Sequence, residues 1–155
     1  MSAPPRPRVP QAVLFACGQN AVRSPMAESL LHQMFPKALY VQSAGVRKGE
    51  LDPFAVAVMA ELGQDISKHK PMTFEELEDW EGLNFDLIVT LSPEAHHKAL
   101  ELTHTIAADV EYWPTLDPTG TEGSREQKLQ AYREVCDGLF MRIRRRFAKG
   151  GAASG

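Results

Sequence analysis

The sequence predicts an α/β protein with a doubly wound parallel sheet and helices on both faces, which gives three layers. Short apolar runs suited to buried strands alternate with segments of helical spacing. Ser-Pro and Asp-Pro pairs precede several of the helical segments, and these residues favour helix starts. The chain has 155 residues, 43% of them hydrophobic, which is enough to bury such a core within one domain.

The first half of the chain alternates strand and helix twice. Met26, Leu30 and Leu31 share one face of the first helix, and Pro36 ends it. Gly63 provides a C-cap for the second helix, which begins with an Asp-Pro pair. We expect strands at residues 13–17 and 38–43 and helices at residues 24–35 and 52–62.

The second half repeats this alternation. Ser92 and Pro93 suit the N-cap and first position of a helix. Pro114 ends the strand expected at residues 109–113. We expect strands at residues 85–91 and 109–113, a short acidic helix or turn at 75–80, a helix from Ser92, and a long helix at 124–147. The Pro-rich residues 1–9 and the Gly/Ala/Ser-rich residues 149–155 are expected to be flexible tails on a single domain of residues 10–148.

Composition excludes several classes of function. The formal charge of −3 predicts no bulk attraction to nucleic acid or anionic membranes, and no apolar run approaches the roughly 20 residues that span a bilayer. The two cysteines, Cys17 and Cys136, lie far apart and share no metal-ligand spacing. We therefore expect a soluble cytoplasmic protein with reduced thiols and with no metal, cofactor, nucleic-acid or membrane partner.

The stretch from Cys17 to Ser24 carries the clearest chemical signal. An apolar strand stops at Cys17 and a helical pattern begins near Ser24, so a strand-to-helix loop lies between them. Such a loop directs backbone N–H groups and the helix dipole at one small space, which favours an oxyanion and the thiolate of Cys17. Arg23 can clasp two oxygens of a tetrahedral anion while the sulfur attacks its central atom. The expected phosphate-binding loop comprises Gly18, Gln19, Asn20, Ala21, Val22 and Arg23.

The Cys-x5-Arg-Ser pattern after the first strand, followed by Pro-Met-Ala-Glu, resembles the low-molecular-weight protein tyrosine phosphatase family, which also contains arsenate reductases. The resemblance implies the strand order 2-1-3-4 and a phospho-cysteine intermediate at Cys17. It also implies that Asp117, in an Asp-Pro pair after the fourth strand, is the general acid. Asp52, in the other Asp-Pro pair, is the alternative acid, because an Asp-Pro pair can equally start a turn.

The resemblance implies two supporting roles near the loop. Asn20 would hold the loop by bonding Ser43 after the second strand, and Ser24 would donate a hydrogen bond to the thiolate. Ser24 equally suits a helix start, where its hydroxyl would cap backbone N–H groups.

Several positions depart from the family pattern. Val22 stands where many relatives have a second cysteine, so the loop cannot form a protective disulfide. The phosphatases place aromatic residues around the substrate ring, whereas this chain has Thr119 with Gly120 at one position and Val46, Arg47 and Lys48 at the other. These positions therefore do not predict phosphotyrosine as the substrate. Arg47 and Lys48 suggest an acidic or multiply phosphorylated substrate, or else are solvated loop charges.

The sequence thus predicts a metal-independent, cysteine-dependent phosphomonoesterase that acts on a phosphorylated protein or a small phosphomonoester. An arsenate reductase that uses external thiols is an alternative, because residues 92–101 contain no relay cysteine and Cys136 suits a buried position in the last helix. A phosphoanion-binding module that has lost turnover is the other alternative.

Overall fold

The computed structural model describes residues 10–147. The strands are β1 (Ala12–Cys17), β2 (Tyr40–Gly45), β3 (Leu87–Thr90) and β4 (Asp109–Tyr112). The helices are α1 (Arg23–Met34), α2 (Pro53–Glu61), α3 (Phe74–Glu81), α4 (Pro93–Leu102) and α5 (Arg125–Phe147), with a short 3₁₀ turn, η1 (Pro118–Gly120). Each expected strand is present, and the acidic segment forms helix α3. The predicted tails, residues 1–9 and 149–155, lie outside the described residues.

The four strands form one parallel sheet in the order β2-β1-β3-β4, which confirms the order that the family resemblance implies. In the β1–β2 register Cys17 is opposite Gly45, and in the β1–β3 register Ala16 is opposite Thr90. The carboxyl ends of the strands therefore meet at one edge, where ligands bind in open sheets of this kind. Cys17 lies on the central strand pair at that edge.

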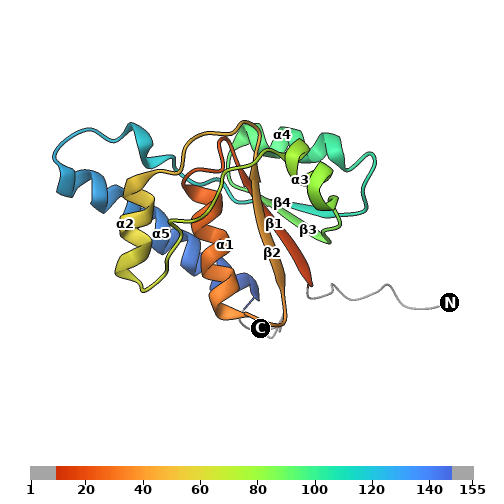
Figure 1. The fold of residues 1–155 in the computed structure, drawn as a ribbon, viewed down its shortest axis with the longest axis horizontal. Helices are drawn as coiled ribbons and strands as arrows, with labels where there is room; N and C mark the ends of the chain where they lie inside the picture. Colours follow the sequence, from red (N-terminus) through yellow and green to blue (C-terminus); the bar gives the residue numbers. More distant parts are fainter. Residues whose placement is uncertain (1–9, 148–155) are drawn as a thin grey trace.

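Helices cover both faces of the sheet, as the doubly wound fold requires. Figure 1 shows α1, α2 and α5 on one face and α3 and α4 on the other. Alternate residues of β1 enter the two cores: Val13 and Phe15 pack with α1 and α5, whereas Leu14 and Ala16 pack with α3 and α4. β1 is thus buried on both sides, and this fixes the backbone from which the Cys17 loop departs.

Helices α2 and α4 begin with side-chain caps, whereas α1, which follows the Cys17 loop, does not. Asp52 caps α2 by accepting a hydrogen bond from Phe54 N at 2.8 Å, and Ser92 caps α4 by accepting one from Ala95 N at 3.2 Å. The alternative role of Ser24 as a helix cap is wrong. Helix α1 begins one residue earlier, at Arg23, with no side-chain cap, because the loop runs directly into its first turn. The Ser24 hydroxyl points instead at Cys17.

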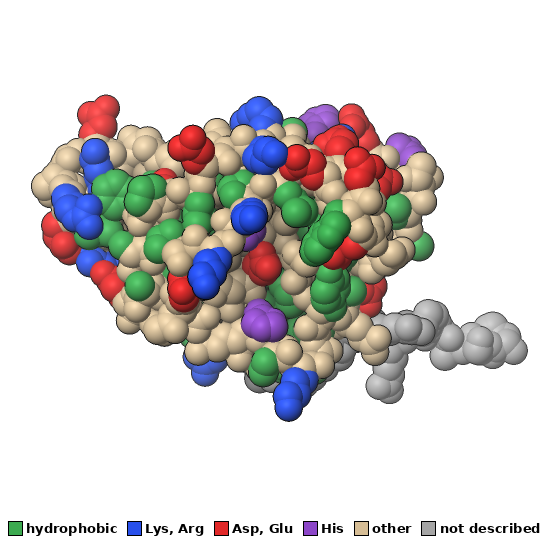
Figure 2. All heavy atoms as spheres, in the orientation of Figure 1, with side chains coloured by type: hydrophobic (Ala, Val, Ile, Leu, Met, Phe, Trp, Pro, Cys, Tyr) green, Lys and Arg blue, Asp and Glu red, His purple; other side chains and the backbone are tan. Residues whose placement is uncertain are grey.

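The surface bears charges of both signs. Figure 2 shows Lys and Arg side chains interspersed with Asp and Glu on the face that it displays. Among the described helices, none is both long and apolar enough to cross a membrane.

Candidate active site

Residues 18–22 form a loop whose carbonyl groups face away from its concave side. The carbonyls of Cys17, Gly18 and Gln19 accept hydrogen bonds from Val46 N, Arg47 N and Gly49 N at 3.2, 2.8 and 3.0 Å. The carbonyls of Ala21 and Val22 accept hydrogen bonds from Asp52 N and Met26 N. Because the carbonyls are engaged by neighbouring backbone N–H groups, the loop amides at the N-terminus of α1 are available to an anion, which such loops favour.

Asn20 holds this loop in shape. Its backbone is left-handed, with φ of 56°, a conformation that asparagine tolerates better than most residues. Its buried side chain donates to Ser24 Oγ and Ser43 Oγ, both at 2.9 Å, and accepts from Met72 N at 2.9 Å. One side chain therefore joins the loop to α1, to β2 and to the segment before α3, and the expected contact with Ser43 is present.

Cys17 lies at the base of the loop with only 2% of its surface exposed. Its Sγ is 3.0 Å from Ser24 Oγ. Because Ser24 Oγ already accepts a hydrogen bond from Asn20, its own proton is free to point at the sulfur. The Ser24 hydroxyl thus contacts the one atom through which a cysteine can act as a nucleophile.

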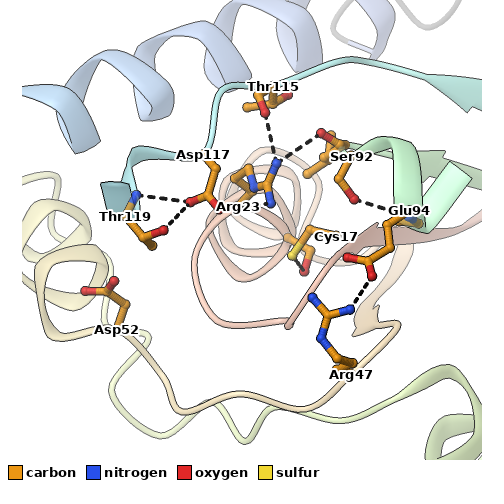
Figure 3. Close-up of polar contacts among 12 residues, drawn as sticks. Cys17, Arg23, Arg47, Asp52, Ser92, Glu94, Thr115, Asp117 and Thr119 are labelled. Carbon is orange, nitrogen blue, oxygen red and sulfur yellow. Dashed lines mark hydrogen bonds and ion pairs between the residues drawn. The ribbon is translucent and has the colours of Figure 1, made fainter. Parts of the chain in front are cut away.

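Arg23 is positioned by the segments that follow β3 and β4. Its guanidinium donates to Thr115 O at 3.0 Å and to Leu91 O at 3.5 Å, and only 12% of the side chain is exposed. Figure 3 shows the guanidinium between Thr115 and Asp117. The two carbonyl acceptors were not foreseen from the sequence, because backbone groups leave no residue-type signal.

Asp117 faces Arg23 across the site, with Oδ2 3.7 Å from Arg23 Nη2. Its other carboxylate oxygen accepts from Thr119 N at 3.0 Å and from Thr119 Oγ1 at 2.8 Å. Partial burial opposes ionisation, but the two Thr119 hydrogen bonds and the Arg23 charge outweigh it and lower the pKa of Asp117. Asp117 is therefore an ionised carboxylate at neutral pH in the free protein.

Asp52, the alternative acid, is placed elsewhere. It caps α2 and accepts a 2.6 Å hydrogen bond from Tyr132 Oη. Figure 3 shows it well apart from Cys17, whereas Asp117 points at Arg23. The contacts of Asp52 are thus those of a structural residue that caps α2 and binds Tyr132.

A cavity of about 110 Å³ opens above the sulfur. Pockets for drug-sized ligands measure roughly 300–1,000 Å³, so this cavity is far smaller. Its size suits a tetrahedral oxyanion. None of its lining residues is aromatic; they are Cys17, Gly18, Gln19, Ala21, Val22, Arg23, Arg47, Glu94, Asp117 and Thr119. Glu94 was not singled out from the sequence, although its place in the first turn after β3 could have indicated it.

Glu28 and His69 lie beneath the loop and extend the Asn20 network. Ser43 Oγ donates to Glu28 Oε1 at 2.5 Å, and a His69 ring nitrogen lies 3.0 Å from Asn20 Oδ1. Burial raises the pKa of Glu28 to about 7, against a lowering by the Ser43 hydrogen bond, and burial lowers the pKa of His69. Glu28 is therefore neutral in mildly acidic solution, and burial disfavours the charged form of His69.

We expect Glu28→Gln to change the pH dependence of stability. The folded-state pKa of Glu28 is raised from 4.5 to about 7, so its contribution is fully present below pH 4.5 and is lost as the pH rises through 7. The wild type should lose up to about 3 kcal/mol of unfolding free energy across this window relative to the variant. Urea unfolding of both proteins at pH 5 and pH 8 measures this difference. Parallel pH profiles would contradict it.

Two other features do not join the site. Cys136 is buried in α5, with Sγ 3.7 Å from Met59 Sδ, and burial raises the pKa of its thiol to about 11. It is an inert core residue, as its helical position suggests. Within residues 10–147, no three His, Cys, Asp or Glu side chains are grouped as metal ligands.

The fold and the site together define a class: a doubly wound α/β protein with a cysteine and an arginine lining one small cavity at the carboxyl edge of its parallel sheet. The model of the low molecular weight phosphotyrosine protein phosphatase family matches residues 12–149, and the chain belongs to this family.

Relatives within the family carry two different names. The chain is 33% identical over 142 residues to an arsenate reductase of Bacillus licheniformis, covering 91% of this chain and 97% of that protein. It is 26% identical to the low molecular weight protein tyrosine phosphatase of T. tengcongensis, with a TM-score of 0.71 over 90% of this chain and 98% of the other. An arsenate reductase in its phosphate-binding state is 27% identical, with a TM-score of 0.68 over 90% and 98%.

Proposed function

We propose that this protein is a phosphatase that hydrolyses phosphate monoesters through a covalent phospho-cysteine at Cys17. The observation that carries the proposal is the convergence of three groups on one small cavity: the Cys17 sulfur at its base, Arg23 on its rim and the Asp117 carboxylate opposite. Nucleophile, oxyanion clasp and proton donor are the parts that phosphoryl transfer through an enzyme intermediate requires.

The first chemical step forms the intermediate. The Cys17 thiolate attacks phosphorus, the bond to the ester oxygen breaks, and that oxygen takes a proton from Asp117. Loop amides and Arg23 hold the three equatorial oxygens throughout. In the second step Asp117 removes a proton from water, the resulting hydroxide attacks phosphorus, and the S–P bond breaks to return the thiolate and inorganic phosphate.

The first step needs a proton on Asp117, so that proton must have a source. Its pKa is lowered in the free protein, so the required proton arrives with a substrate monoanion, whose second pKa is about 6. A bound dianion brings no proton, so on that route Asp117 takes one from solvent; this uptake becomes easier once the dianion engages Arg23, whose charge otherwise keeps Asp117 ionised. On either route we expect kcat/KM to decline as the pH rises above about 6.

Arsenate reduction is the second candidate, and the names of the curated relatives favour it. Arsenate is a tetrahedral oxyanion that the same cavity can accept. Reduction needs further thiols, and Cys136 is buried in the core. An arsenate reductase built on this chain would therefore take its reducing thiols from another molecule.

One set of assays separates the candidates. Chelator-treated protein is incubated with 4-nitrophenyl phosphate and, separately, with arsenate plus glutathione or a dithiol. Hydrolysis that resists chelation supports the phosphatase, and arsenate-dependent thiol consumption without hydrolysis supports the reductase. Phosphate binding with neither activity would overturn both and leave a binding module.

The loop geometry makes a further prediction at Gly45. An added Cβ would lie 2.7 Å from Arg47 O and 2.8 Å from Asn20 N, both backbone atoms, so the loop must shift. We expect Gly45→Ala to lower kcat/KM for 4-nitrophenyl phosphate by about 10²-fold, the loss that a misplacement of about 1 Å can cause. Gly138→Ala, in α5 with no atom within 4 Å of the new Cβ, is the matched control. Equal activities in the two variants would contradict the prediction.

A further inference from the structure

The open side of the cavity is bounded by an ion pair rather than by aromatic rings. Arg47, from the segment after β2, pairs through Nη1 with Glu94 in the first turn of α4, and both side chains line the cavity. Gly18 lies directly beneath: a Cβ there would be 3.0 Å from Glu94 Oε1 and 3.7 Å from Arg47 Nη2. The absence of a side chain at Gly18 therefore lets the pair lie close over the loop.

The backbone around Arg47 is held against the loop. Val46 N, Arg47 N and Gly49 N donate to the carbonyls of successive loop residues. Lys48, the neighbouring cation, turns away to Glu76 on α3 at 2.8 Å and does not line the cavity. Of these two neighbouring cations, Arg47 is thus the one that faces the site.

Arg47 has donors beyond those used by Glu94. Figure 3 shows one terminal nitrogen on Glu94 and the other directed toward Cys17. The pair is about half exposed on both sides, with side-chain exposures of 56% and 43%, so its attraction is weak and a ligand can compete for the guanidinium. A planar guanidinium can bind one carboxylate or phosphate while its other edge stays on Glu94.

We propose that Arg47 determines specificity by binding a second anionic group of the substrate. This rests on the proposed phosphatase function and names its substrate class: compact phosphomonoesters with a carboxylate or second phosphate next to the scissile phosphoryl group. The phosphoryl group occupies the loop and Arg23, and the second anion meets Arg47 at the mouth. Glu94 anchors the guanidinium, and Asp117 on the opposite rim disfavours an anion there.

The test compares three small ligands that differ in the charge beside the phosphate: phosphoglycolate, ethyl phosphate and phosphoethanolamine. Isothermal titration calorimetry on the Cys17→Ala background measures their affinities without turnover. Phosphoglycolate is expected to bind about two- to fivefold tighter than ethyl phosphate, the gain typical of one partly exposed ion pair. Arg47→Ala in the same background should remove most of this preference, Arg47→Lys should retain part of it, and Lys48→Ala should keep it.

The outcomes separate this inference from the proposed function. Equal affinities for the three ligands, tightest binding of phosphoethanolamine, or equal losses in Arg47→Ala and Lys48→Ala would overturn the role of Arg47. None of these results bears on hydrolysis, which the 4-nitrophenyl phosphate assay decides in the wild type. Thermal unfolding of each variant checks that a lost preference is not a lost fold.

Discussion

Cys17→Ala is expected to abolish hydrolysis of 4-nitrophenyl phosphate while inorganic phosphate still binds. Loss of the nucleophile removes the covalent route, and losses of about 10⁴-fold or more are usual when such a group is deleted. The loop amides and Arg23 remain, so the anion site itself persists. The side chain removed is small and its sulfur contacts Ser24, so the fold should tolerate the change.

Cys136→Ala is the matched control for this prediction. It also deletes a buried thiol, but one that packs against Met59 in the core, away from the cavity. We expect a modest loss of stability and retained turnover. If Cys136→Ala and Cys17→Ala lost activity to the same extent, the effect would be one of folding and the nucleophile would not be assigned.

Asp117→Asn should slow poor leaving groups far more than good ones. Asparagine keeps the size of the side chain but cannot protonate the departing oxygen, so alkyl phosphates should lose about 10²–10⁴-fold. Aryl phosphates with acidic phenols need little protonation and should lose much less. The measurement is kcat/KM across a series of phosphate esters, plotted against leaving-group pKa, for the wild type and the variant.

The control for this series is Asp52→Asn. Asp52 caps α2 and accepts from Tyr132, so its loss should cost stability without changing the dependence on the leaving group. A uniform loss across the series in Asp117→Asn would show that Asp117 acts only through Thr119 and the turn that follows. The acid would then have to be sought elsewhere.

Much of the fold was predictable because local patterns carry it. The continuous apolar run around Leu87–Thr90 indicates a buried parallel strand, and Ser92 with Pro93 indicates a helix start; both are present. The order of the strands is not local. It depends on which strands pair across long separations in the chain, and it followed only from the family resemblance.

Local sequence patterns likewise predict some parts of the candidate site and not others. Cys17 and Arg23 stand on one short loop, so their proximity follows from the strand-to-helix pattern. The pairing of Arg47 with Glu94 joins elements 47 residues apart, and no local pattern specifies it. The sequence left the role of Ser24 open, because a serine near a helix start usually serves as a cap. In the structure its hydroxyl instead accepts a hydrogen bond from the buried Asn20 side chain and contacts Cys17.

The most direct test of the central proposal is to trap the intermediate. Wild-type protein is mixed with excess 4-nitrophenyl phosphate near pH 5.5, quenched within milliseconds and examined by mass spectrometry after proteolysis under conditions that preserve S–P bonds. We expect one phosphoryl group on the peptide containing Cys17 in the wild type and none in Cys17→Ala. Steady hydrolysis with no phosphorylated Cys17 peptide, or the same label in Cys17→Ala, would contradict it.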